Sequence, residues 1–222
     1  MSGQETRDRI LDAAETLFVT HGFAKTSIRA VTQQAGVNVA AVHYHFGSKD
    51  DLIREVLLRR IEPVNRERLR LLDACLDSAE PPSLECIVNA FIEPAVRLSG
   101  DDSPAGAVIP RLLGRIHSEP GEAFHQALVE LFAETKRRFS IALSRALPGL
   151  SPTDLIWRLN FLVGALAHSI GAPHLLRHIS NGLCDPAETE TTRRQLLAFV
   201  CAGLRAPSIE ARDTSPSEEI EP

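Results

Sequence analysis

Residues 26–49, TSIRAVTQQAGVNVAAVHYHFGSK, decide the fold, because apolar residues recur there at helical spacing on both sides of Gly36. In the second half, Val42 and Phe46 lie four residues apart and therefore on one face of a helix. Two short helices joined around a glycine are typical of a helix-turn-helix. An ordinary helical hairpin has the same spacing, so the pattern alone leaves both interpretations open.

Polar residues suited to helix N-termini divide this stretch. We expect Thr26 to cap the first short helix and Asn38 the second, because both side chains can accept a hydrogen bond from a free backbone N–H. Ser48, with Asp51 three positions later, predicts the start of a longer helix. Apolar residues at helical spacing predict another helix over residues 7–20. The N-terminal region should therefore contain three helices and the beginning of a fourth.

The charge distribution favours DNA binding over a simple hairpin. Residues 25–49 carry Lys25, Arg29 and Lys49 but no acid, whereas 29 acids in 222 residues would place about three in a window of this length. Double-stranded DNA carries one negative charge per roughly 1.7 Å of its axis, so a surface that faces it should lack carboxylates. The net charge of −5 is no objection, because five acids are concentrated in residues 207–222. The Pro, Ser and Glu content of that segment predicts a disordered acidic tail.

The composition is that of a globular protein. Hydrophobic residues make up 44% and charged residues 24% of the chain, and no apolar run reaches the roughly 18 residues of a membrane span. Residues 1–20 contain several acids and therefore do not resemble a signal peptide. The four cysteines form no CxxC pair. We interpret them as reduced thiols of a cytoplasmic protein with no membrane partner.

The rest of the chain predicts helices only, since no segment alternates with a period of two. Pro63 should kink or restart the long helix after Ser48, and Arg66, Arg68 and Arg70 should follow on a charged face. Proline and glycine divide the remainder into expected loops at 99–107 and around 173–186, and expected helices at 83–98, 108–118, 121–147, 152–170 and 187–204.

Several motifs within residues 5–60 resemble the DNA-binding domain of TetR-type transcriptional regulators. They agree in order and spacing at residues 9–14, 17–18, 21–23, 26–29, 35–37 and 43–49. The resemblance implies an all-α homodimer. Residues 4–64 would form a three-helix DNA-binding domain, with the helix-turn-helix at about 27–46, and residues 65–206 a helical effector-binding and dimerisation domain. A weaker resemblance, at residues 60–63 and 90–94, is to the subgroup that includes fatty-acid-responsive regulators.

The resemblance also implies which residues contact DNA. In the family, the positions of Tyr44 and Lys49 contact phosphates, and that of His43 approaches bases or backbone. Arg29 has the reach for a phosphate or a guanine edge. The apolar residues 39–41 cannot read a donor–acceptor pattern, so DNA shape should contribute to specificity. The candidate DNA-binding residues are Thr26, Ser27, Arg29, Asn38, Val39, Ala40, His43, Tyr44, His45 and Lys49.

Candidate effector-binding residues lie on the helix expected at 108–118. Arg111, Arg115 and His117 accompany apolar residues there, so a cation could meet a ligand carboxylate while apolar side chains cover its chain. We therefore expect an anionic amphipath, such as a fatty acid or its thioester, with a neutral aromatic compound as the alternative. Binding of this effector should release a repressor from double-stranded operator DNA. An activator or dual regulator of the same family remains an alternative interpretation.

Other functional classes have little support in the sequence. No G-x-S-x-G motif or phosphate-binding glycine loop suggests an enzyme, and an adaptor with a vestigial DNA-binding motif would have lost its basic contacts. His168, His174 and His178 lack ligand spacing with a carboxylate or cysteine, so we expect neither a metal nor a cofactor.

Apolar residues near the C-terminus predict either a dimer interface or the core of one subunit. Two helices from each subunit would form a four-helix interface with an apolar centre. The residues concerned are Leu155, Leu159, Leu162, Val163, Leu166, Ile170, Leu196, Leu197, Phe199, Val200 and Leu204.

Overall fold

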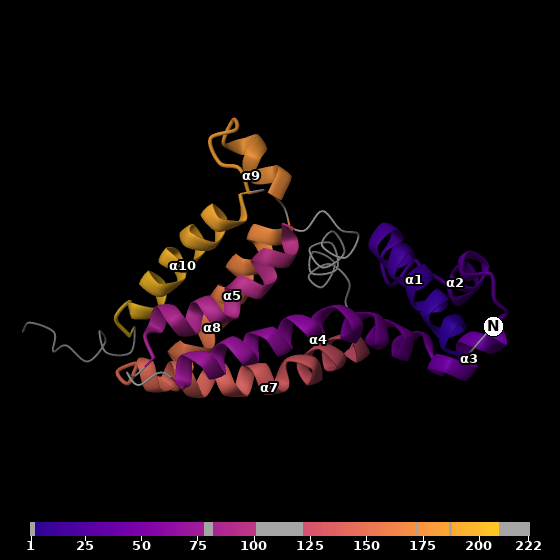
Figure 1. Ribbon diagram of the computed structural model, residues 1–222, viewed down its shortest axis with the longest axis horizontal. Helices are drawn as coiled ribbons and strands as arrows, with labels where there is room; N and C mark the ends of the chain where they lie inside the picture. The colour runs from indigo at the N-terminus through magenta and orange to yellow at the C-terminus, as the bar shows by residue number, and fades with distance from the viewer. Residues whose placement is uncertain (1–2, 78–81, 101–121, 172, 187, 209–222) are drawn as a thin grey trace, which may run out of the picture.

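The computed structural model describes residues 3–77, 82–100, 122–171, 173–186 and 188–208 (Figure 1). Helices are the only regular secondary structure in these ranges, which confirms the predicted all-α fold class. The helices are α1 (Gly3–His21), α2 (Ile28–Ala35), α3 (Val39–Phe46), α4 (Lys49–Leu76), α5 (Leu84–Ser99), α7 (Glu122–Ala146), α8 (Pro152–Gly171), α9 (Pro173–Ile179) and α10 (Thr189–Arg205).

Helices α1–α3 and the first half of α4 form one compact unit at one end of the molecule (Figure 1). Its core is built from apolar residues at helical spacing, which turn the same face of each helix inward. Among them, Ile10, Phe18, Leu52 and Val56 have no exposed surface. The rings of Phe18 and Phe23 lie with their centroids 5.1 Å apart and close the core beneath the α1–α2 connection.

The observed helix N-caps agree with the predicted ones at two of three positions. Asn38 accepts a hydrogen bond from Ala41 N at 2.8 Å, and Ser48 and Asp51 form a reciprocal capping box at the start of α4. The prediction that Thr26 caps α2 is wrong, because Ser27 does so by accepting from Ala30 N at 3.1 Å. Thr26 is instead buried, and its hydroxyl donates to Gly22 O at 2.7 Å.

Helix α4 continues through Pro63, so of the two expected outcomes, a kink or a restart, the restart is wrong. Proline removes one backbone donor, which leaves the carbonyl four residues earlier, that of Arg59, without its helical partner. Pro63 and Arg59 both lie on the exposed side of α4, where water can satisfy that carbonyl. The helix therefore runs unbroken from the N-terminal unit into the second core (Figure 1).

The second core lies between α4, α5, α7, α8 and α10. Helix α7 runs alongside α4, and α5 packs against both α4 and α10 (Figure 1). Leu72, Ile87, Ile92, Phe139 and Leu143 are fully buried at its centre. Helix α9 replaces part of the loop expected at residues 173–186, because Pro173 can occupy a first helical turn as well as a loop.

The state of the cysteines differs from the prediction. A disulfide joins Cys75 to Cys86, so the interpretation of all four cysteines as reduced thiols is wrong. The reversal of the chain between α4 and α5 brings the Cα atoms of the two cysteines to 6.1 Å, a proximity that local spacing does not reveal.

The helix expected at 108–118 and the tail from residue 209 onward lie outside the described residues. In the described part of the chain, none of the helices combines the length and apolar character needed to span a membrane.

Candidate nucleic-acid interface and internal cavity

The α2–α3 pair is held in a fixed orientation by its turn and by α1. Gly36 ends α2 with φ +63°, a left-handed conformation that glycine adopts without a steric penalty. Arg9 of α1 donates to the carbonyls of Ala35 and Gly36 in this turn. Asn38 then starts α3. The turn therefore fixes both short helices relative to α1.

Ion pairs attach α1 to α4 on the other side of the unit. Arg60 of α4 donates two hydrogen bonds, of 2.5 and 2.7 Å, to the buried carboxylate of Glu15, and Arg59 pairs with Asp12 at 2.6 Å. A two-point guanidinium–carboxylate pair restricts rotation as well as separation. The α2–α3 pair is therefore attached to α4 through α1.

Tyr44 is the most exposed aromatic residue of this unit, with 84% of its surface accessible. Its ring contacts His45 edge-on with centroids 5.1 Å apart, and its hydroxyl has no hydrogen-bond partner among the described residues. Val39 and Ala40 are also exposed on α3, as are Ser27 and Arg29 on α2. These side chains are free to contact a partner that approaches α2 and α3 from outside.

The other candidate DNA-binding residues have internal contacts that orient them. The His43 ring nitrogen Nδ1 lies 2.8 Å from Gly47 O, and His45 is half-buried beside Phe46. Lys49 Nζ donates to Ala24 O at 3.3 Å, which places its ammonium group beside the α1–α2 connection. Thr26 differs from the other candidates because it is buried, and its hydroxyl bonds within the protein.

A small cavity of about 70 Å³ lies between α4, α5, α7 and α8. Its lining is apolar except for one arginine, Arg68. The residues that close it include Val64, Phe91, Phe132, Val163, Leu166 and Ile170. Arg111, Arg115 and His117, the effector residues expected from the sequence, lie outside the described residues.

Arg68 is buried, so the expected charged face formed by Arg66, Arg68 and Arg70 is wrong for its middle member. Residues two apart in a helix point about 200° apart, so Arg68 faces the core while its neighbours face solvent. Arg68 is four residues from Val64 and from Leu72, which are both buried, so all three lie on one face of α4. This spacing is the feature of the sequence that could have predicted the burial of Arg68.

Among the described residues, the guanidinium of Arg68 is bound by neutral groups alone. Its Nε donates to Phe91 O at 2.8 Å and its Nη1 to Asn65 Oδ1 at 3.1 Å, while its carbon lies 4.1 Å above the Phe91 ring. Asn65 is oriented by its own hydrogen bond to Leu131 O of α7, of 3.1 Å. Burial lowers the pKa of Arg68 to about 10, so the group remains protonated at neutral pH.

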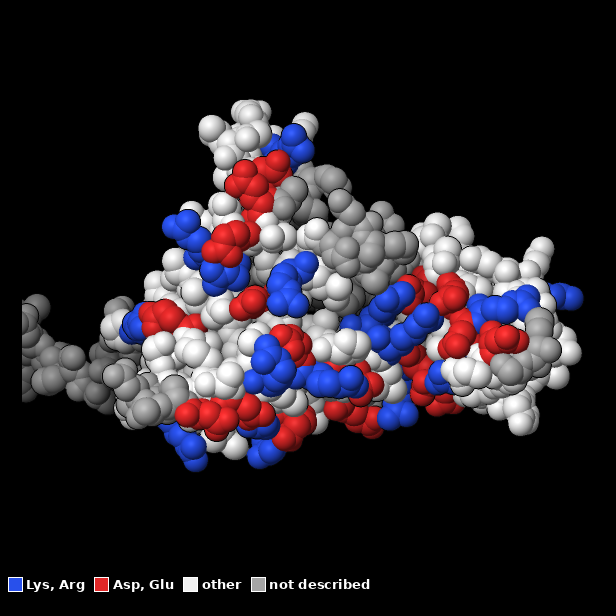
Figure 2. Space-filling view, viewed as in Figure 1, with Lys and Arg blue, Asp and Glu red and all other residues white. Residues whose placement is uncertain are grey.

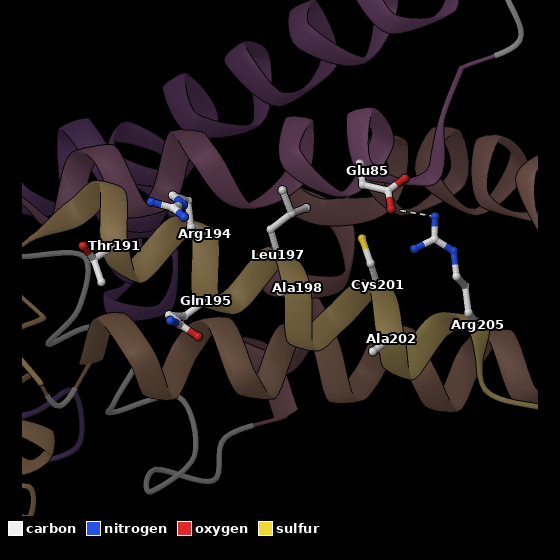
Figure 3. Close-up of a pocket in the computed structure, with 9 residues that line it drawn as sticks. All are labelled: Glu85, Thr191, Arg194, Gln195, Leu197, Ala198, Cys201, Ala202 and Arg205. Atoms are coloured by element: carbon white, nitrogen blue, oxygen red, sulfur yellow. Dashed lines mark ion pairs between the residues drawn. The ribbon is translucent and has the colours of Figure 1, made fainter.

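An open groove of about 790 Å³ runs along the outer face of α10 (Figure 3). Glu85 of α5 and Arg205 close one end of it with an ion pair of 2.6 Å. Cys201 lines it, and burial, with a smaller effect of the Glu85 charge, raises the pKa of this thiol to about 11. The thiol is therefore protonated and unreactive at neutral pH.

The apolar surface beside this groove differs from the set expected to form a dimer interface. Most of the expected residues, including Leu155, Leu162 and Leu166, are buried in the subunit's own core. The exposed apolar residues of α8 and α10 are Ile156, Trp157, Phe161, Val163 and Phe199, and of these Val163 and Phe199 belong to the expected set. The Trp157 and Phe161 rings stack with centroids 5.9 Å apart.

Charged side chains on the view in Figure 2 alternate in sign along α4 and α7, so no large region of one charge covers the helices there. Pairs such as Arg66–Glu62 and Arg137–Glu134 account for this alternation. In the described ranges, no three His, Cys, Asp or Glu side chains are grouped so that they could hold a metal ion.

Two family models match this chain. Residues 10–56 match that of the bacterial regulatory proteins of the tetR family. Residues 89–203, more than half of the chain, match that of the tetracyclin repressor-like C-terminal domain.

Curated relatives and solved structures agree with these matches. The chain is 33% identical over 90 residues to the HTH-type transcriptional regulator SrpR of Pseudomonas putida, covering 40% of this chain and 39% of SrpR. It is 31% identical over 138 residues to the HTH-type transcriptional repressor BdcR of Escherichia coli strain K12, covering 59% of this chain and 66% of BdcR. The chain thus spans less than two thirds of the length of either relative.

The fold itself is shared with the transcriptional regulator FadR of Bacillus subtilis, solved in complex with stearoyl-CoA. The TM-score is 0.62 at 13% identity, and the superposition covers 88% of this chain and 98% of FadR. The helix-turn-helix unit, the helical second core and the matches to both family models lead to one conclusion: the chain belongs to the TetR family of bacterial transcriptional regulators.

Proposed function

We propose that this protein is a ligand-responsive repressor that binds operator DNA as a homodimer and is released by a small molecule. The observation that carries the proposal is the surface of α2 and α3. It presents the exposed Tyr44 hydroxyl and the exposed Arg29 on a helix pair that is fixed to α1, and the segment from 25 to 49 contains no acid. The relative BdcR is named a repressor, which supports repression rather than activation.

The contacts are assigned by chemistry. Tyr44 and Lys49 donate hydrogen bonds to phosphates, Arg29 reaches a phosphate or a guanine, and His43 and His45 lie at the edge of the major groove. Ser27 and Asn38 start the two helices at the DNA surface, and Val39 and Ala40 contact bases without reading their hydrogen-bond pattern. Thr26 supports this surface from below. The protein acts in the cytoplasm, where operator DNA lies.

Dimerisation brings two such surfaces to one operator. The exposed aromatic residues of α8 and the neighbouring face of α10 are the contact region for the second copy, because a cluster of this kind would otherwise remain in water. Half-sites one turn of DNA apart, roughly 34 Å, tolerate little change in spacing between the two DNA-binding domains. A ligand that moves α4 relative to α7 therefore weakens operator binding.

Selection of bound sequences from a random DNA pool, followed by binding measurements with and without candidate ligands, tests the function as a whole. A regulator of this kind should enrich a palindromic sequence with two half-sites. Failure to enrich any sequence, with a folded dimeric protein, would contradict the proposal.

Replacing Lys49 by alanine should weaken binding to operator and unrelated DNA alike, because an ionic phosphate contact carries no sequence information. The slope of log affinity against log salt concentration should fall by about one unit. Lys49→Arg should retain the slope, and Lys136→Ala, on the exposed side of α7, should change nothing. A weaker complex with an unchanged slope would mean that Lys49 acts through its hydrogen bond to Ala24 rather than on a phosphate.

Replacing Tyr44 by phenylalanine removes only the hydroxyl and keeps the exposed ring. We expect affinity to fall by about two- to tenfold for all sequences, with no change in the salt slope, since a neutral hydrogen bond is lost. The same isotherms measure this change. Equal affinities of the variant and the parent would remove the hydroxyl from the DNA-contact surface.

A further inference from the structure

The six arginines of α4 differ in whether they pair with a carboxylate, and the proposed DNA contacts do not explain this difference. Five of them form an ion pair with a carboxylate, at Arg54–Glu130, Arg59–Asp12, Arg60–Glu15, Arg66–Glu62 and Arg70–Glu67. Arg68 is the sixth, and it has no carboxylate partner among the described residues. It is also the most deeply buried of the six, with 5% of its surface exposed.

A buried charge without a counter-ion is costly, and proteins usually pair it or replace it with an apolar residue. The two neutral acceptors of Arg68 satisfy two of its five N–H groups, and within the described part of the chain its charge has the Phe91 ring beside it but no counter-ion. The guanidinium borders the cavity between α4, α5, α7 and α8, whose other lining residues are apolar. The missing partner is therefore an anion that can enter an apolar space.

We propose that Arg68 is the anion-binding residue of the effector cavity and that the effector is a carboxylate with an apolar body. This inference rests on the proposed ligand-responsive function. The carboxylate accepts hydrogen bonds from the guanidinium N–H groups that Phe91 and Asn65 leave free, and Val64, Leu166 and Ile170 contact the apolar part of the molecule. The chemistry matches that expected for Arg111 and Arg115, but Arg68 now supplies the positive charge.

The size of the cavity connects binding to regulation. At about 70 Å³ it is well below the roughly 300–1,000 Å³ that hold a drug-sized ligand, so a carboxylate with more than a few carbons must separate the surrounding helices. Helix α4 carries Arg68 and, about 28 Å along its axis, Lys49 at the DNA surface. Asn65 bonds both Arg68 and the α7 backbone, so the ligand would act on the contact between α4 and α7.

The test compares carboxylates with matched neutral molecules in the absence of DNA. Butanoate, octanoate, dodecanoate and benzoate are titrated by calorimetry and thermal shift, each beside the alcohol of the same carbon skeleton. At least one carboxylate should bind the parent protein more tightly than its alcohol. Arg68→Met should lower carboxylate affinity by about ten- to hundredfold while leaving alcohol affinity within a factor of about two. Arg68→Lys, which keeps the charge, should lie between the two.

Arg66→Met is the matched control, because Arg66 lies two residues away on the same helix but is exposed and paired with Glu62. It should bind carboxylates like the parent. Equal carboxylate affinity in Arg68→Met and the parent, or no binding of any of these carboxylates, would overturn the inference. If Arg68→Met does not fold, two other comparisons test the inference. They are the carboxylate affinity of the parent against that of Arg68→Lys, and the affinity of the parent for each carboxylate against that for its alcohol.

Failure of the proposed function has a different signature. Carboxylates that bind through Arg68 without changing operator affinity would contradict ligand-controlled repression and leave the anion site intact. Operator binding that persists in an Arg68→Met protein insensitive to carboxylates would support both.

Discussion

Replacing Trp157 and Phe161 by glutamate should convert the proposed dimer into a monomer and reduce operator affinity by more than about a hundredfold. The two rings are 58% and 60% exposed on α8 and stack on each other, so in a lone subunit they form an aromatic patch in water. Aromatic residues at the centre of an interface commonly contribute about 2 kcal/mol or more each. Two carboxylates at that position would also face their counterparts in the second copy across a low-dielectric contact.

The loss of operator affinity follows from the loss of the second half-site. A dimer gains a high effective concentration for its second DNA-binding domain once the first has bound, whereas a monomer has only one. Sedimentation should give twice 24.3 kDa for the parent and 24.3 kDa for the variant. Val129→Glu is the control, because Val129 is an exposed apolar residue of α7, away from this patch. A variant that remains dimeric would place the interface elsewhere.

Replacing Phe18 by alanine should unfold the DNA-binding unit while leaving the second core folded. Phe18 has no exposed surface and packs on Phe23 at the centre of the first core. A buried Phe→Ala substitution costs about 3–5 kcal/mol, against a total stability of about 5–15 kcal/mol for a domain. The first unit is small, and α4 and the contacts of Leu128, Leu131 and Phe132 of α7 join it to the rest of the molecule, so it has little stability to lose.

Chemical denaturation followed by circular dichroism should then show an early transition for the first unit and a later one for the second. Operator binding should be lost with the first transition, while the dimer persists. Leu183→Ala, at a fully exposed leucine, should change stability by less than about 0.5 kcal/mol. A single transition at the parent's midpoint would show that Phe18 can be removed without cost and would contradict the packing described.

Features that depend on neighbours in the chain were predicted from the sequence. Asn38 and Ser48 start α3 and α4 as expected, and Gly36 ends α2, because a cap or a left-handed turn involves only a few consecutive residues. The resemblance at residues 5–60 is local in the same sense, since its motifs lie on four successive helices in a fixed order. Even here the cap of α2 is Ser27 and not the predicted Thr26. Adjacent hydroxyls are equally suited to capping, and the carbonyls of Leu17 and Gly22, to which Thr26 donates, distinguish them.

Features that depend on which helices meet were decided by the tertiary structure. Arg66, Arg68 and Arg70 form one basic run in the sequence, yet α5 and α7 cover only the side of α4 that carries Arg68. Cys75 and Cys86 show no motif and become partners because the chain reverses between α4 and α5.

Which apolar residues of α8 are buried also depends on the neighbouring helices. Leu155 and Trp157 are both hydrophobic, and their positions relative to α5 and α10 decide that one fills the core and the other faces outward. The physical reason is common to all these cases. Residue type and spacing determine how a helix forms and which face is apolar, whereas burial of a given side chain depends on atoms supplied by segments far away in the chain.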